Sequence, residues 1–78
     1  MSASVFERRV FGRKVRSRRL ELGYTMRETA AGTGVSLSTY ANWEKGKTMP
    51  DGGWRMRNLS AFLRVHQGYW WPTDEDRE

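Results

Sequence analysis

The stretch from Thr25 to Gly46 constrains the fold most, because it predicts two short helices joined by a sharp turn. Thr25 and Glu28 have the spacing of a capping box, in which each side chain satisfies a free amide at a helix start. Gly34 can take a positive φ at the turn, and Ser36 can cap the helix that follows. Gly46 can end that second helix in a left-handed conformation. The sequence therefore predicts two helices within residues 25–46 that meet at Gly34.

Further helices are predicted on both sides of this pair. Ser4 and Glu7 form a second capping box, which opens an amphipathic helix of about 18 residues ending near Gly23. Another helix is expected over residues 54–65, and a last short one at residues 69–71. No alternation of apolar and polar residues is long enough for a strand. The predicted fold class is therefore all-α, with five helices.

The charge is distributed unevenly along the 78 residues. Lys and Arg number 14 against 9 Asp and Glu, and seven of those bases fall between Arg8 and Arg19. Residues 74–78 carry a net charge of −3, which leaves +8 on residues 1–73. This asymmetry favours a polyanionic partner, with nucleic acid ahead of a membrane surface, although the basic run could equally be a solvated helix face. We expect one domain over residues 1–73 and a disordered acidic tail over 74–78.

The sequence lacks the residues that several classes of function require. There is no cysteine, so neither a disulfide framework nor a thiolate metal site is expected, and His66 is the single histidine. There is no phosphate-cradling glycine loop and no pair of acids at helical spacing, so we predict no catalysis and no cofactor. No apolar run approaches a membrane span. A cytoplasmic binding protein is the expectation.

The second of the paired helices, predicted from Leu37 to Lys45, has two distinct sides. Val35, Tyr40 and Trp43 lie where this helix must pack into a core. Between them, short polar side chains fall on the outward side. An exposed helix with such side chains at its N-terminal end fits the major groove of DNA.

An ordered set of short matches relates the chain to a known family. It consists of Val15-Arg16, Arg19, Leu22-Gly23, Thr25, Glu28, Ala30, Gly34-Val35-Ser36, Trp43-Glu44-Lys45-Gly46-Lys47, Pro50 and Leu59-Ser60-Ala61-Phe62-Leu63. In these residues the chain resembles the lambda-repressor-like helix-turn-helix proteins, the XRE and phage repressor/Cro group. The resemblance covers roughly residues 11–71. It implies a compact five-helix domain with a helix-turn-helix at about residues 25–46.

The resemblance also implies roles for individual positions. Base contacts are implied for Leu37, Ser38, Thr39 and Asn42. Phosphate contacts are implied for Thr25, Arg27, Lys45 and Lys47. A structural salt bridge is implied between Arg19 and Glu44. A dimer contact is implied for Tyr69, Trp70 and Trp71, of which one or two could instead cap the core.

Four residues depart from the family pattern. Met26 stands where the family often has a Gln that touches the DNA backbone. Thr29 and Thr33 replace buried aliphatic residues, which suggests an underfilled core. Arg64 stands where a glycine often ends a helix.

The resemblance implies a DNA-binding transcriptional regulator of prokaryotic, phage or plasmid origin. We expect a homodimeric repressor that occupies an operator in double-stranded DNA and needs no small-molecule effector. One alternative is an antitoxin or other interaction module whose C-terminal aromatic residues bind a partner protein. A more distant alternative is a first helix that lies on a membrane surface, with Val10 and Phe11 beside arginines.

Overall fold

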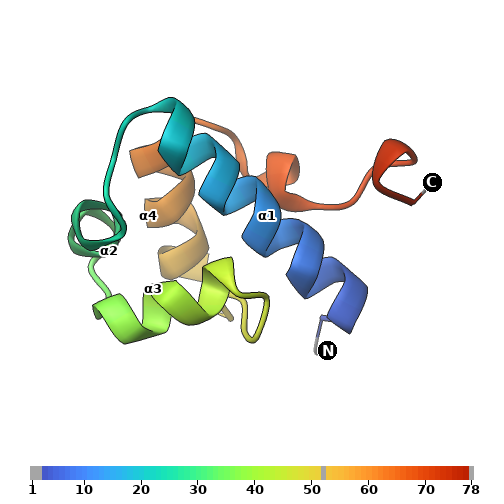
Figure 1. The fold of residues 1–78 in the computed structure, drawn as a ribbon, viewed down its shortest axis with the longest axis horizontal. Coiled ribbons are helices and arrows are strands. Elements are labelled where there is room, and N and C mark those ends of the chain that lie inside the picture. The colour runs from blue at the N-terminus through green and yellow to red at the C-terminus, as the bar shows by residue number, and fades with distance from the viewer. Residues whose placement is uncertain (1–2, 52, 78) are drawn as a thin grey trace.

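The computed structural model describes residues 3–51 and 53–77, and all of its regular elements are helical (Figure 1). In chain order these are α1 (Val5–Glu21), α2 (Met26–Thr33), α3 (Leu37–Glu44), α4 (Gly53–Leu63) and two 3-10 helices, η1 (Gln67–Trp70) and η2 (Glu75–Arg77). The all-α class is confirmed, whereas the prediction of five α-helices is wrong. The fifth segment is the 3-10 turn η1, because the backbone is extended on both sides of it, with ψ 160° at His66 and 145° at Trp71.

Local capping signals position α1, α2 and α3 as the sequence predicts. The Glu7 amide donates to Ser4 Oγ at 3.1 Å, and the Ser4 amide donates to Glu7 Oε1 at 2.9 Å. Thr25 and Glu28 repeat this reciprocal pair at the start of α2. Gly34 then takes a φ of 85° at the turn into α3. The helix-turn-helix is thus defined by short-range hydrogen bonds and one left-handed glycine.

The end of α4 has Arg64 at the position where the resemblance implies a glycine. Arg64 takes a φ of 60°, which non-glycine residues rarely adopt. Arg18 of α1 donates from Nε to the Leu63 carbonyl at 2.8 Å and from Nη2 to the Arg64 carbonyl at 3.4 Å. These bonds satisfy carbonyls that the helix end leaves free.

The core lies between all four α-helices and η1. Its fully buried side chains are Phe11, Val15, Tyr40, Trp43, Leu59, Leu63 and Trp70. α1 crosses α3 closely at Gly12, where a Cβ atom would lie 2.6 Å from the carbonyl oxygens of Trp43 and Glu44. Only glycine fits at this crossing.

Both threonines that replace family aliphatic residues are completely buried. Thr29 Oγ1 donates to the Thr25 carbonyl at 2.9 Å. Thr33 Oγ1 has no hydrogen-bond partner in the described part of the chain. The hydroxyl of Thr33 is therefore a buried polar group without compensation.

Trp70 belongs to the core, which corrects its assignment to a dimer contact. Its side chain is 0% exposed, its indole Nε1 donates to Ser60 Oγ at 2.8 Å, and its ring meets Phe11 edge-on at 5.5 Å. A residue buried inside one protomer cannot also face a second one. Tyr69 and Trp71 remain exposed, at 37% and 45%.

The acidic tail, predicted to be disordered, folds back toward α1 as far as the structure describes it. Asp76 in η2 pairs with Lys14 Nζ at 3.2 Å and accepts from the Thr73 amide at 2.8 Å. Lys14 also donates to the carbonyls of Tyr69 and Trp71, both at 3.1 Å. Residue 78 of this tail lies outside the described residues.

Candidate nucleic-acid interface

The helix α3 separates a buried side from an exposed one. Tyr40 and Trp43 anchor it in the core. Ser38, Asn42 and Lys45, spaced at i, i+4 and i+7, fall on the opposite side, where Ser38 and Lys45 are exposed and Asn42 is half-buried. Two of the four predicted base-reading positions, Ser38 and Asn42, therefore share an outward face with Lys45.

The predicted readers differ in how free their polar groups are. The side chain of Asn42 makes no hydrogen bond with another described residue, so both ends of its amide are available. Thr39 is engaged at the helix start, since its amide donates to Ser36 Oγ at 3.1 Å and its hydroxyl accepts from Ser36 at 3.0 Å. Leu37 is 38% exposed and offers only apolar contact. Asn42 and Ser38 are thus the stronger candidates for base contact, and Thr39 also shapes the start of α3.

Unpaired cations lie at both ends of the two-helix unit. Arg27 in the first turn of α2, Lys45 at the end of α3 and Lys47 just beyond it are all exposed. None of the three forms an ion pair with another described residue. Cations placed in this way are free to meet the phosphates on either side of a groove.

The Thr25 hydroxyl already forms the N-terminal cap of α2. It accepts from the Glu28 amide at 3.0 Å, so it keeps only its O–H hydrogen for a phosphate. The backbone hydrogen bond from Thr25 also lowers the pKa of Glu28, which therefore stays ionised beside this position.

The salt bridge expected between α1 and α3 is present and mostly buried. Arg19 Nε lies 2.6 Å from Glu44 Oε2, and its Nη1 donates to the Tyr24 carbonyl at 2.9 Å. The Tyr40 hydroxyl donates to the same carboxylate. The hydrogen bond to Glu44 raises the pKa of Arg19, and burial raises that of Tyr40. The cluster fixes α3 against α1, which is a structural role.

The basic run of α1 turns out to serve mainly the fold. Arg8, Lys14, Arg18 and Arg19 all donate to backbone carbonyls of other segments. Arg9 and Arg16 are exposed and form no ion pair within the described residues. Among the arginines of α1, these two are therefore the ones whose guanidinium groups are free to meet a polyanionic partner. The sequence does not predict these partners, because they are backbone carbonyls and every residue type has one.

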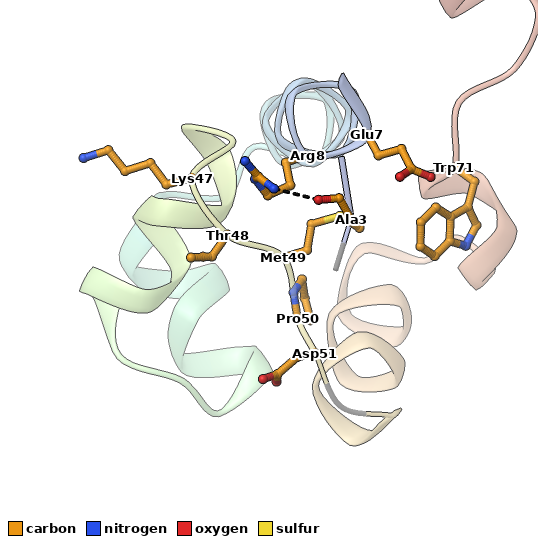
Figure 2. Close-up of a pocket in the computed structure, with 9 residues that line it drawn as sticks. All are labelled: Ala3, Glu7, Arg8, Lys47, Thr48, Met49, Pro50, Asp51 and Trp71. Atoms are coloured by element: carbon orange, nitrogen blue, oxygen red, sulfur yellow. Dashed lines mark hydrogen bonds between the residues drawn. The ribbon is translucent and has the colours of Figure 1, made fainter. Parts of the chain in front are cut away.

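A surface groove lies beside Lys47 and was not predicted. It has a volume of about 770 Å³ and is lined by Ala3, Glu7, Arg8, Lys47, Thr48, Met49, Pro50, Asp51 and Trp71 (Figure 2). It joins the start of α1, the loop after α3 and the exposed Trp71. No single residue type marks it in the sequence.

Other kinds of site find no support in the described residues. They contain no group of three or more His, Cys, Asp or Glu side chains placed to hold a metal ion. None of the described helices is long and apolar enough to cross a membrane.

Together, two helices meeting at Gly34, a polar outward face on the second, and free cations at both ends define a DNA-binding helix-turn-helix regulator. A family model described as helix-turn-helix matches residues 15–66, which is more than half of the chain. The chain belongs to this lambda-repressor-like helix-turn-helix family, whose members are DNA-binding regulators and are not typically enzymes. Comparisons with curated proteins and with solved structures gave no match.

Proposed function

We propose that the protein is a sequence-specific regulator that binds an operator in double-stranded DNA as a homodimer and represses transcription by occupying a promoter. The observation that carries this proposal is the outward face of α3, where Ser38 and the unbonded amide of Asn42 lie between free cations. A helix with this arrangement fits the major groove and can read base edges there.

Reading is assigned to the N-terminal two turns of α3. The carboxamide of Asn42 can donate to and accept from adenine at once, which distinguishes this base from the other three. Ser38 can donate to or accept from a base edge. Leu37 can contact a thymine methyl group, which polar residues bind less well.

Contacts to the DNA phosphates are assigned to the cations that flank this face. Arg27, Lys45 and Lys47 have no ion-pair partner among the described residues to give up when they meet phosphates. Each phosphate they neutralise releases counterions, so affinity should fall steeply with salt concentration. These contacts fix the register of the protein on the duplex but carry no sequence information themselves.

A homodimer fits the size of the domain. Each copy has one helix α3 and can therefore contact one half-site. Its longest dimension is 32 Å, close to the roughly 34 Å of one DNA turn that separates two half-sites. Two copies related by a twofold axis would read a palindrome. The exposed rings of Tyr69 and Trp71 supply apolar surface for the contact between them.

Footprinting on the protein's own upstream region tests this function. A protected palindrome, lost in a Ser38→Ala/Asn42→Ala double variant that remains folded by circular dichroism, is the expected result. Equal affinity of the wild-type protein for that region and for a random duplex would contradict sequence-specific regulation.

Antitoxin activity is the second candidate, favoured by Trp71, which is exposed and lines the groove beside Lys47. In this case a partner protein, not a second copy, would cover the aromatic surface. Neighbouring genes and co-purification with a product encoded beside the protein separate the two candidates.

A further inference from the structure

The loop that follows α3 is tied to the first turns of α1 by one arginine. Arg8 Nε donates to the Gly46 carbonyl at 3.3 Å. Its Nη1 donates to the Ala3 carbonyl at 2.7 Å (Figure 2). The Gly46 carbonyl belongs to the peptide bond that leads into Lys47. Arg8 therefore joins the chain just before α1 to the peptide that carries Lys47.

The backbone contact at this point is close. Gly46 takes a φ of 75°, and a Cβ atom there would lie 3.2 Å from Arg9 Cα and 3.3 Å from the Arg8 carbonyl oxygen. On the other side, the amides of Lys47 and Thr48 donate to the Asn42 carbonyl at 3.0 and 3.4 Å. The loop is held between α1 and α3, and the same carbonyl links it to the residue assigned to base reading.

The two neighbouring cations play different parts. Arg8 is half-buried and directs two of its donors at backbone carbonyls. Lys47 is exposed, has no ion-pair partner among the described residues, and extends its ammonium group away from Arg8 in Figure 2. Of the two, Lys47 alone is placed to meet a phosphate.

We propose that Arg8 is a positioning residue for DNA binding, which fixes the loop after α3 so that Lys47 meets the phosphate backbone in a preset direction. This inference rests on the proposed function. A side chain whose backbone is already ordered loses less conformational entropy on binding, and the gain appears as affinity. Lysine is a poor replacement for Arg8, because a single Nζ would have to reach both carbonyls at once, whereas Nε and Nη1 of Arg8 each meet one of them.

The test uses Arg8→Lys, which keeps the charge and removes the fork. Arg9→Lys is the matched control for loop exchange, at an exposed arginine that forms no ion pair within the part of the chain that the structure describes. In the free protein, amide exchange measured by NMR should accelerate at Lys47 and Thr48 in Arg8→Lys, with exchange in α2 and α4 unchanged. Arg9→Lys should leave both loop amides as they are.

DNA affinity is then measured for Arg8→Lys in the wild-type and Lys47→Ala backgrounds. We expect Arg8→Lys to weaken duplex binding about threefold to tenfold in the wild-type background, from the cost of ordering one long side chain. It should have no effect once Lys47 is alanine.

Three results overturn the proposal. Retained affinity in Arg8→Lys together with a loss in Arg8→Gln would make Arg8 a phosphate contact itself. An equal loss in both backgrounds, with faster exchange across all helices, would mean that Arg8 only stabilises the fold. Unchanged exchange at Lys47 and Thr48 would mean that Arg8 does not hold the loop. Absence of any DNA binding by the wild-type protein would instead refute the proposed function, and the exchange measurement distinguishes that case.

Discussion

Arg19 of α1 and Glu44 at the end of α3 form a two-point ion pair, with Nε–Oε2 at 2.6 Å and Nη2–Oε1 at 3.2 Å. Their side chains are 9% and 7% exposed. Because the same carboxylate also accepts from Tyr40, three side chains from two helices share one buried charge centre. This centre orients the helix that carries the proposed base-reading residues.

Removing one partner of this pair should therefore be costly. Arg19→Ala leaves Glu44 with an uncompensated, mostly buried charge, and we expect a loss of about 3–5 kcal/mol in the free energy of unfolding. Urea denaturation measures it. Arg16→Ala, at an exposed arginine on the same helix, should change stability by less than about 0.5 kcal/mol. Unchanged stability with impaired DNA binding would instead make Arg19 a phosphate contact.

The buried Tyr40 hydroxyl should make stability fall at alkaline pH. Burial, followed by its hydrogen bond to Glu44, raises the pKa of Tyr40 far above its ordinary value of 10.0. The folded state therefore holds this proton more tightly than the unfolded state. The stabilising contribution is complete below pH 10 and is lost as pH rises above it.

Tyr40→Phe provides the comparison for that pH dependence. It removes one hydrogen bond to a charged group, so we expect a loss of about 1.5–3 kcal/mol at pH 7. The difference in stability between wild type and variant should shrink between pH 10 and pH 11.5. A difference that stays constant over that range would show that Tyr40 does not titrate with unfolding.

The unsatisfied hydroxyl of Thr33 predicts a stabilising substitution. Thr33→Val keeps the shape of the side chain and removes a buried oxygen without a partner, so stability should rise by about 1 kcal/mol. Thr29→Val is the matched control, because its hydroxyl is bonded to the Thr25 carbonyl and its loss should bring no gain. Thermal denaturation of both variants decides the matter. A lower melting temperature for Thr33→Val would mean that its hydroxyl has a partner.

Alanine substitutions at the two adjacent tryptophans should change different properties, namely stability at Trp70 and self-association at Trp71. Trp70→Ala empties part of the core and removes the donor to Ser60, so we expect about 3–5 kcal/mol of destabilisation. Trp71→Ala should leave circular dichroism and stability nearly unchanged and shift sedimentation toward the monomer. A Trp71→Ala protein that still sediments as a dimer would remove Trp71 from the proposed contact.

Features set by neighbouring residues could be predicted from the sequence. Both capping boxes and the left-handed Gly34 involve residues within a few positions of one another. The two sides of α3 likewise follow from helical periodicity. These local signals were sufficient for the helix-turn-helix and for the exposure of its reading face.

Features that depend on distant backbone atoms could not be predicted. Lys14 and Arg18 donate to carbonyls 45 to 57 positions away in the sequence. Every residue has a backbone carbonyl, so no residue type identifies which one accepts. The run of bases therefore suggested a DNA-binding surface, where the structure uses four of them internally. Trp70 and Trp71 are adjacent residues of the same type, and it is the position of Ser60 and Phe11 in space that separates the buried ring from the exposed one.

The central claim, that α3 reads bases while the flanking cations grip phosphates, is tested most directly by comparing Asn42→Ala with Lys47→Ala. Each variant is titrated with operator and random duplex at three salt concentrations. Asn42→Ala should weaken operator binding by roughly 1–3 kcal/mol per half-site and leave the salt dependence nearly unchanged. Lys47→Ala should weaken both duplexes and flatten the slope of log K against log salt by about 1 per half-site. An equal loss on both duplexes for Asn42→Ala, with no loss for Lys47→Ala, would contradict the account and place the DNA-binding surface elsewhere.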